Sequence, residues 1–205
     1  GQVEAHTGAI QRELEAVLRH QEAIPSFQDI STEQALITSD ARWKTFFFYA
    51  YGRRMEQNCA TCPQTAAILK RIPGMTTAFF SILLPNKSIP VHRGPYAGVL
   101  RYHLGLKIPV PASSCAIEVG GAVAHWEEGR SLIFDDTFLH KAWNGSDQMR
   151  VVLFVDFRRP LRFPLSLLNR SWIYLMSVSP FIKGMVRRQG KWDRMFQDAY
   201  QEAER

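Results

Sequence analysis

Seven short β-prone runs follow one another between residues 75 and 157, and no helical segment separates them. Pairs of turn residues divide many of these runs, as at Gly120-Gly121 and Asn144-Gly145. The runs are MTTAFFSILL, GVLRYHLGLKI, CAIEV, VAHW, SLIF, FLHKAW and RVVLFVDF. Closely spaced strands without intervening helices are typical of antiparallel sandwiches and jelly rolls. The sequence therefore predicts a mainly β fold of this kind over residues 75–160.

Shorter elements are expected on both sides of this β-rich core. Helical spacing of apolar residues, or an opening proline, predicts helices over residues 4–22, 63–72, 166–186 and 191–204. The aromatic run WKTFFFYAY, residues 43–51, is typical of a strand.

The length of the chain favours a single domain, because 205 residues of which 46% are hydrophobic suffice for one sizeable core. We expect three parts within it: an N-terminal helical and strand region, the jelly-roll core and basic C-terminal helices, at residues 1–74, 75–160 and 161–205.

Three cysteines do not make a disulfide framework, and their odd number favours a reducing, cytoplasmic location. Cys59 and Cys62 form a C-x-x-C pair, the spacing of zinc ligands and of redox thiols. A zinc site needs four ligands and a redox motif needs a βαβ setting, and the sequence around this pair offers neither. Incidental thiols beside a helix start are the favoured interpretation.

The net charge of +6 comes from the C-terminal end, where residues 158–205 hold ten Lys and Arg against four Asp and Glu. Residues 161–188 combine basic side chains with Trp172 and many aliphatic residues. Such a segment suits peripheral contact with an anionic membrane, in a bacterium at the inner face. The alternative is a pair of helices that cap the end of the sandwich. No apolar stretch is long enough to predict a membrane-spanning helix, and no nucleic-acid-binding motif accompanies the charge.

Two histidines in the core are candidate metal ligands. His92 lies in the loop-like stretch IPVHRGPYAG just before a strand, and His140 lies on a later strand. A jelly roll brings such distant strands side by side. Imidazole suits Fe(II), and two histidines leave coordination positions open for a co-substrate and dioxygen.

Arg150 strengthens this interpretation. If Asn144-Gly145 is the centre of a tight hairpin, His140 and Arg150 face each other across two strands. The guanidinium would then lie deeper than the imidazole and bind the far carboxylate of a dicarboxylate that chelates the metal. The alternative is a surface cation at a strand start, but the apolar run VVLFVDF that follows Arg150 argues for burial.

Three further polar residues share faces with the core strands. Arg101 and His103 lie two residues apart, so both side chains point to one side of their strand, towards a substrate and a co-substrate respectively. Ser81 shares a face with Phe79 and Leu83, and its hydroxyl can donate to a carboxylate. The alternative for each is an ordinary exposed or structural role.

The segments HRGPYAGVLRYHLGLKIP, WEEGRSLIFDDTFLHKAWN and RVVLFVDFRRPL resemble the aspartyl/asparaginyl β-hydroxylase family over about residues 60–160. The resemblance implies a double-stranded β-helix, cupin-like in shape, and an Fe(II)- and 2-oxoglutarate-dependent dioxygenase that uses O2. Members of this family hydroxylate an unactivated C–H bond.

Carried over residue by residue, the resemblance implies that His92 and His140 bind iron. Ser81, His103 and Arg150 would bind 2-oxoglutarate, and Arg101 the substrate. The usual third ligand is a carboxylate two residues after the first histidine, and that position here is Gly94.

A water can take the position that Gly94 leaves open, and Asp136 would bind this water from outside the ligand set. Asp135, Glu118 and His103 are weaker substitutes for the missing ligand.

The substrate expected from the resemblance is either an Asp- or Asn-like side chain or a lipid acyl chain. The protein hydroxylases have a second arginine two residues before the one matching Arg101, and this chain has Val99 there. The motif HRxPYAGxLRYHLGL and the tail from NRSW are similar to the corresponding segments of the bacterial lipid A acyl-chain 2-hydroxylases, although Gly94 departs from the pattern of that branch. Two alternatives stay open: a cupin-type metal enzyme that does not use 2-oxoglutarate, and a catalytically silent anion-binding module.

Overall fold

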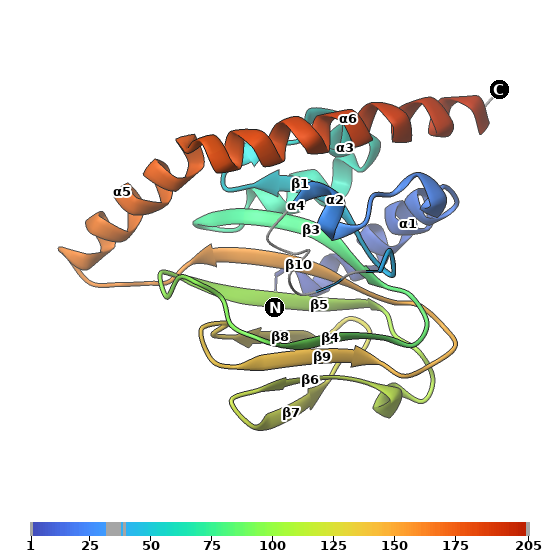
Figure 1. Cartoon of the computed structure of the whole chain (residues 1–205), viewed down its shortest axis with the longest axis horizontal. Helices are drawn as coiled ribbons and strands as arrows, with labels where there is room; N and C mark the ends of the chain where they lie inside the picture. The colour runs from blue at the N-terminus through green and yellow to red at the C-terminus, as the bar shows by residue number, and fades with distance from the viewer. Residues whose placement is uncertain (1, 32–37, 39, 204–205) are drawn as a thin grey trace.

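The computed structural model describes residues 2–31, 38 and 40–203. Two antiparallel sheets pack face to face and form a double-stranded β-helix, with helices on the outer face of the larger sheet (Figure 1). The larger sheet has the order β2-β1-β3-β10-β5-β8, and the smaller has the order β4-β9-β6-β7. The expectation of a jelly-roll core with flanking helices is confirmed.

The first three strands belong to the larger sheet, and from β3 onward the chain crosses repeatedly between the two sheets. Their bounds are β1 Trp43–Ala50, β2 Arg53–Arg54, β3 Met75–Leu83, β4 Lys87–His92, β5 Val99–Lys107, β6 Cys115–Val119, β7 Ala122–His125, β8 Ser131–Phe134, β9 His140–Asn144 and β10 Arg150–Arg158.

Most helices lie before β3 or after β10. Their bounds are α1 Thr7–Leu18, α2 Phe27–Ile30, α3 Glu56–Thr61, α4 Pro63–Lys70, α5 Leu165–Val178 and α6 Pro180–Ala203, with short 3-10 turns at Glu4–His6, Gln21–Ala23 and Ala112–Ser114.

All seven strands expected between residues 75 and 157 are present, and the aromatic run at residues 43–51 forms a strand as expected, whereas β2 and β4 were not expected. The expected loop around His92 is the end of a strand, β4, because Lys87, Ser88 and Ile89 pair with β9 despite Pro90. The aromatic strand β1 is not peripheral to the core: it joins the larger sheet beside β3.

Two apolar layers hold the molecule together. One lies between the larger sheet and the helices, where α1 buries Ile10, Leu14 and Val17 against the sheet. The other lies between the two sheets and includes Trp126 and Val152. The inner layer is the one that receives the polar side chains of the candidate site.

The predicted hairpin between β9 and β10 is wrong, because the two strands belong to different sheets. Arg150 is paired with Leu83 on β3, and His140 with His92 on β4. The reason is the side chain of Asn144, which is fully buried and donates through Nδ2 to the carbonyls of Leu83 (3.1 Å), Leu84 (3.2 Å) and Gln148 (2.7 Å). This amide makes a corner at which the chain crosses between the sheets.

The two C-terminal helices divide at Pro180, about ten residues earlier than expected. Proline lacks a backbone N–H and fits the first position of a helix, which explains the break. The long helix α6 then runs along the outside of the body and buries Ile182, Met185 and Phe196 (Figure 1).

The three cysteines are buried and free of disulfides. Burial raises the pKa of Cys59 to about 11 and raises the pKa of Cys62 further. Thiols held in the protonated form are poor nucleophiles and poor metal ligands, so the interpretation of this pair as incidental fits the structure.

Candidate functional site

His92 and His140 lie together at one end of the smaller sheet. They are directly paired across β4 and β9, and their ring centroids are 4.1 Å apart. The strand that was expected to be a loop is therefore what brings the first histidine to the second.

Both imidazoles are fixed in the same tautomer by the backbone. Nδ1 of His92 donates to the carbonyl of Pro90 (2.8 Å), and Nδ1 of His140 donates to that of Phe138 (2.9 Å). Because a carbonyl only accepts, the proton sits on Nδ1 and the lone pair on Nε2 is free. Histidines that bind a metal ion commonly have their other ring nitrogen fixed by a hydrogen bond in this way.

The electrostatic surroundings also keep both histidines neutral. Burial is the largest cause of a lowered pKa for His92 and for His140, and the nearby charge of Arg101 lowers both pKa values further. Neutral imidazole is the form that binds a metal ion. Across the described parts of the chain, no cluster of three or more His, Cys, Asp and Glu side chains surrounds a possible metal position. The pair therefore fits a metal such as Fe(II) as two protein ligands.

Asp136 occupies the space that a side chain at position 94 would need. A Cβ atom on Gly94 would lie 2.1 Å from Oδ2 of Asp136, and the backbone N–H of Gly94 donates to the carbonyl of Asp136 (2.7 Å). The carboxylate is almost fully buried, and its Oδ1 has no hydrogen-bond partner within the described residues. Glycine at 94 thus admits a carboxylate from another part of the chain.

Arg101 is held between two carboxylates. Its guanidinium lies 2.8 Å from Oδ2 of Asp136 and 3.0 Å from Oδ1 of Asp156, and it covers the ring of Phe154 at 4.3 Å. Burial raises the pKa of Asp156, and the arginine opposes that shift. The structure therefore places Arg101 beside the histidines as the positioning partner of Asp136, with its charge already compensated.

His103 lies on the same face of β5 as Arg101, deeper between the sheets. It packs against Phe134, Phe154 and Trp126 at ring-centroid distances of 5.1, 5.2 and 6.0 Å. Neither ring nitrogen has a hydrogen-bond partner among the described residues. Burial, followed by the charges of Arg150 and Arg101, lowers its pKa well below the ordinary value, so the ring is neutral.

Arg150 is the most unusual residue of the interior, because it is a cation only 2% exposed. Its Nη1 donates to the carbonyl of Ser81 (3.3 Å), and its Cζ lies 4.5 Å from the ring centroid of Trp126. Burial lowers the pKa of Arg150 to about 9, which still leaves it charged at neutral pH. No carboxylate pairs with it in the described ranges, and its Nε has no hydrogen-bond partner there.

Ser81 lies on β3, beside Arg150 on the neighbouring strand β10. Its hydroxyl oxygen accepts a hydrogen bond from Nε1 of Trp43 (3.1 Å), so the hydroxyl hydrogen remains available to an acceptor. The side chain is buried with Leu83 and Phe79 on the inner face of the larger sheet, as the alternation of the strand predicts.

The predicted site residues form a continuous series of contacts. From the paired His92 and His140, ring contacts lead through Phe134 to His103, and through Trp126 to Arg150. The structure thus brings together all the residues that the sequence nominated, although not by the expected hairpin. Two of the three weaker candidates for a third ligand are engaged in ion pairs: Asp135 pairs with Arg159, and Glu118 with Lys141 (3.0 Å).

Two residues of the site were missed. Asp156 stands directly opposite Arg101 across β10 and β5, and a single carboxylate in the apolar run VVLFVDF was a usable signal of a buried ion pair. Trp126 covers Arg150 and stacks on His103, and nothing in its surroundings in the sequence distinguishes it from a core tryptophan.

Comparisons with known proteins agree with this geometry. The family profile described as aspartyl/asparaginyl beta-hydroxylase matches residues 4–160. The chain is 49% identical over 203 residues to the ornithine lipid ester-linked acyl 2-hydroxylase of Rhizobium tropici, covering 99% of this chain and 71% of that protein. It is 36% identical over 123 residues to the human aspartyl/asparaginyl beta-hydroxylase, covering 58% of this chain and 16% of that protein.

A solved structure, the cupin domain of Schizosaccharomyces pombe Cnp3, is similar in shape with a TM-score of 0.42 and 8% identity, covering 65% of this chain and 72% of that one. So remote a likeness carries no inference about activity. The profile match, which covers most of the chain, and the site built from His92, His140 and Arg150 lead to one conclusion. The chain belongs to the aspartyl/asparaginyl β-hydroxylase family.

Proposed function

We propose that the chain is an Fe(II)- and 2-oxoglutarate-dependent dioxygenase that hydroxylates carbon 2 of an ester-linked acyl chain in an amino-acid-containing lipid. The reaction consumes O2 and 2-oxoglutarate, converts a C–H bond into C–OH, and releases succinate and carbon dioxide. One oxygen atom enters the substrate and the other enters succinate, so the two electrons from the C–H bond and the two from the decarboxylation together reduce O2.

The observation that carries the proposal is the buried, uncompensated charge of Arg150. Removing a guanidinium from water without a counter-charge costs several kcal/mol, so a fold that keeps one in its interior has a ligand to satisfy it. Arginine binds a carboxylate through two parallel hydrogen bonds. The free hydroxyl hydrogen of Ser81, on the adjacent strand, offers a further donor to the same carboxylate.

The two histidines supply the other end of the site. With Nδ1 tied to the backbone, His92 and His140 present Nε2 to a metal ion. Bound Fe(II) would supply the activation of dioxygen, and its remaining positions would be open to the co-substrate. Asp136, held by Arg101, directs an unpartnered carboxylate oxygen towards the position left by Gly94 and can accept a hydrogen bond from water there. His103, neutral and without a partner, lies between the two ends.

An acyl substrate is favoured over an acidic side chain for two reasons. The relative that is 49% identical over nearly the whole chain is named for an ornithine lipid ester-linked acyl chain. In addition, Asp136 and Asp156 already compensate Arg101, and position 99 is valine, so the site has little free positive charge to bind a second carboxylate.

The co-substrate assignment is tested by anaerobic titration of the protein with Fe(II) and 2-oxoglutarate, followed by visible absorption. We expect a metal-to-ligand charge-transfer band that is lost in His92→Ala and in His140→Ala, and at least tenfold weaker 2-oxoglutarate binding in Arg150→Met, about 1.4 kcal/mol or more. The matched control is His125→Ala, since His125 lies on β7 and its Nδ1 bonds to the carbonyl of Cys115. If no band forms in the wild-type protein, the chain is a silent anion-binding module or a cupin-type enzyme.

The substrate assignment is tested by succinate release with three candidate substrates: an ornithine lipid, a lipid A precursor and an Asp- or Asn-containing peptide. We expect turnover and a 2-hydroxyacyl product with the ornithine lipid. Coupled hydroxylation of the peptide alone would refute the acyl assignment and leave the co-substrate assignment intact.

A further inference from the structure

Helix α5 is exposed on nearly all sides. Of its 14 residues only Asn169 is buried, although the helix contains many large apolar side chains. Half of the large exposed hydrophobic side chains of the described residues lie between positions 163 and 175: Phe163, Leu165, Leu167, Leu168, Trp172, Tyr174 and Leu175. Most soluble proteins do not leave a patch of this kind uncovered.

Hydrogen bonds are prominent among the contacts that hold α5 to the body, beside a ring contact between Tyr96 and Trp172. Asn169 accepts from the hydroxyl of Tyr96 (2.6 Å) and donates to the carbonyl of Gly98 (2.8 Å). Further along, Arg53 donates to the carbonyl of Ser177 (3.0 Å). An amphipathic helix normally turns its apolar face to the core, whereas this one is tethered by hydrogen bonds and presents its apolar side chains outward.

Positive charge surrounds the exposed apolar surface. Residues 161–188 contain five Lys and Arg and no Asp or Glu. Arg162 and Arg170 are exposed beside α5, and Lys183 and Arg187 are exposed on the first turns of α6. Apolar side chains with aromatic residues and a cationic border are the composition of segments that lie in the headgroup region of anionic membranes. No described helix has the length and hydropathy needed to cross a bilayer.

Grooves flank α5 on two sides. One, of about 760 Å³, lies between the helix and the loop that follows His92 and is lined by Tyr96, Leu165, Leu168 and Trp172. The other, of about 1220 Å³, lies against the larger sheet and is lined by Phe157, Phe163 and Leu167, with Arg158 and Arg170 among its cations. Both have the dimensions and apolar character to receive lipid chains.

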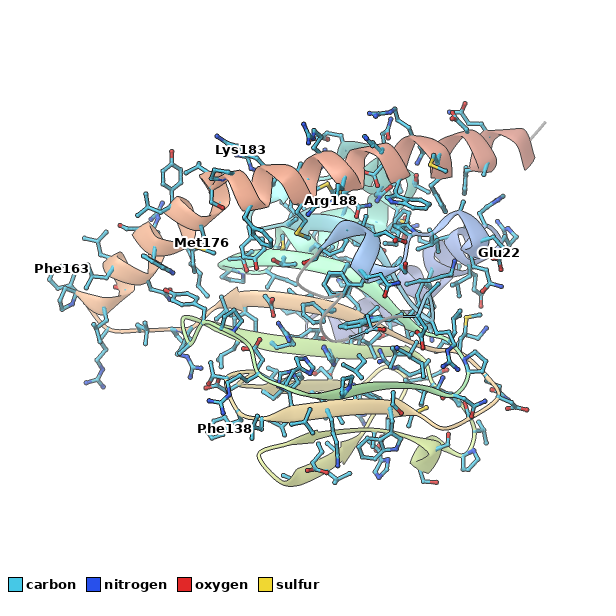
Figure 2. All side chains as sticks on the ribbon, in the orientation of Figure 1. Glu22, Phe138, Phe163, Met176, Lys183 and Arg188 are labelled. Atoms are coloured by element: carbon cyan, nitrogen blue, oxygen red, sulfur yellow. The ribbon has the colours of Figure 1, made fainter. Side chains whose placement is uncertain are left out.

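The end of the molecule that bears α5 is also the end that bears the histidines. Phe138 and Leu139, which directly precede His140, are 58% and 51% exposed. Figure 2 shows Phe138 and Phe163 at the same end of the molecule, in the lower and upper halves of the view. Asn169 links α5 to Gly98, on the loop that leads on from His92.

We infer that α5, with the preceding loop, docks on the surface of a bilayer that contains anionic phospholipid. Phe163, Leu168 and Trp172 enter the headgroup region, and Arg162 and Arg170 bind lipid phosphates. In this orientation the exposed Phe138 and Leu139, which precede His140, face the same surface. The inference concerns a surface, and it stands whether or not the proposed reaction is correct.

Vesicle flotation of the full chain tests the inference, without metal or substrate. Vesicles of phosphatidylcholine alone are compared with vesicles that also contain phosphatidylglycerol, and we expect binding to the second kind. Leu168→Asp combined with Trp172→Asp should weaken that binding at least tenfold. The control is Val110→Asp, at an 83% exposed residue outside α5 and both grooves.

A charge-matched pair of variants separates local docking from net charge. Arg162→Glu with Arg170→Glu should weaken binding at least tenfold, because the change replaces the attraction of two cations to anionic phospholipid by repulsion. Arg12→Glu with Arg19→Glu changes the net charge equally on exposed residues at α1 and should leave binding near the wild-type value. Equal losses in both pairs would overturn the inference.

Sedimentation velocity without vesicles tests whether a second copy of the chain, rather than a bilayer, covers α5. We expect a monomer for the wild-type protein and for the α5 variants. A wild-type dimer that the Leu168→Asp and Trp172→Asp changes dissociate would show that a second copy of the chain covers α5, and would also overturn the inference.

Discussion

Several buried side chains of the proposed site are unusual because they lack a counter-charge or a hydrogen-bond partner. Arg150 has no counter-charge, His103 has no hydrogen-bond partner on either nitrogen, and one oxygen of Asp136 is unpaired, all within the described parts of the chain. Buried polar groups are normally satisfied, and each exception requires an explanation. A ligand that brings one carboxylate to Arg150 and a polar group to the histidines would satisfy most of them at once.

The first prediction at this scale is that Arg150→Met stabilises the protein in the absence of ligands. Replacing a buried, unpaired cation by an apolar side chain of similar length should raise the free energy of unfolding by about 1–2 kcal/mol. Urea denaturation at pH 7 measures the change.

Arg101→Met is the matched control, and we expect it to lower the free energy of unfolding. Arg101 compensates both Asp136 and Asp156, so its loss should cost about 3 kcal/mol. If Arg150→Met destabilises the protein as much as Arg101→Met does, then Arg150 is satisfied within the fold and the argument for a carboxylate ligand is lost.

A second prediction concerns the shared space of Gly94 and Asp136. Gly94→Ala places a methyl group 2.1 Å from a carboxylate oxygen, and the resulting displacement should cost about 1–3 kcal/mol of stability. In an Asp136→Ala background the same change meets no carboxylate and should cost less. Thermal unfolding of the two single variants and the double variant measures the coupling, and additive effects would contradict the geometry.

At the scale of elements, α6 is joined to the body by a buried carboxylate. Oδ1 of Asp193 accepts from Asn58 on α3 (2.9 Å) and from Gln189 (2.6 Å). Burial raises the pKa of Asp193 from 3.8 to about 6. The folded state therefore holds a proton that the unfolded state has lost between these two values, so this group makes the protein less stable as the pH rises through that window.

The third prediction follows from this loss of stability with rising pH. Asp193→Asn should match the wild type near pH 4 and exceed it at pH 8 by up to about 3 kcal/mol, because the amide keeps the acceptor and removes the buried charge. Urea denaturation at a series of pH values gives the difference. Asp198→Asn, at an exposed residue of the same helix, should show no such pH-dependent gain.

The elements differ in how far the sequence predicts them. Strands β3, β5 and β10 and helix α4 could be predicted, because alternation, apolar runs and an opening proline are local signals. Strand β4 could not, because Pro90 and the glycines after it are typical of a loop and only pairing with β9 makes it a strand.

The corner at Asn144 could not be predicted from local sequence signals either. Asn-Gly predicts a tight hairpin, but the amide of Asn144 donates to the carbonyls of Leu83 and Leu84, about 60 residues earlier in the chain, and these two contacts exist only once both sheets are formed. The candidate site residues still lie together in spite of this error, because they were also chosen from the resemblance to the family, which does not depend on the hairpin. The partner of Arg101 was not found, because a cross-strand ion pair depends on the register of two strands.

At the scale of the whole molecule, the two apolar layers have different roles. The layer between the larger sheet and the helices is closed and apolar, whereas the layer between the sheets receives Arg150 and His103 and leads to the histidines at one end. Helix α6 buries Phe196 in the layer between the larger sheet and the helices and Met185 in the cluster that contains Phe79 and Phe154, and α5 extends from the end that bears the histidines (Figure 1). The proposed site and the exposed helix α5 therefore lie at the same end of the molecule. The sequence predicted the site residues and the basic, Trp-containing tail, but not that the two lie together.

Docking through α5 would change which substrate concentration governs the rate of an enzyme. A protein that rests on a bilayer through Leu168 and Trp172 meets a lipid substrate by lateral diffusion in two dimensions, so the fraction of the surface that the substrate occupies determines the turnover rate. Diluting the vesicles at fixed composition would then lower the amount of bound enzyme and leave the turnover of each bound molecule unchanged.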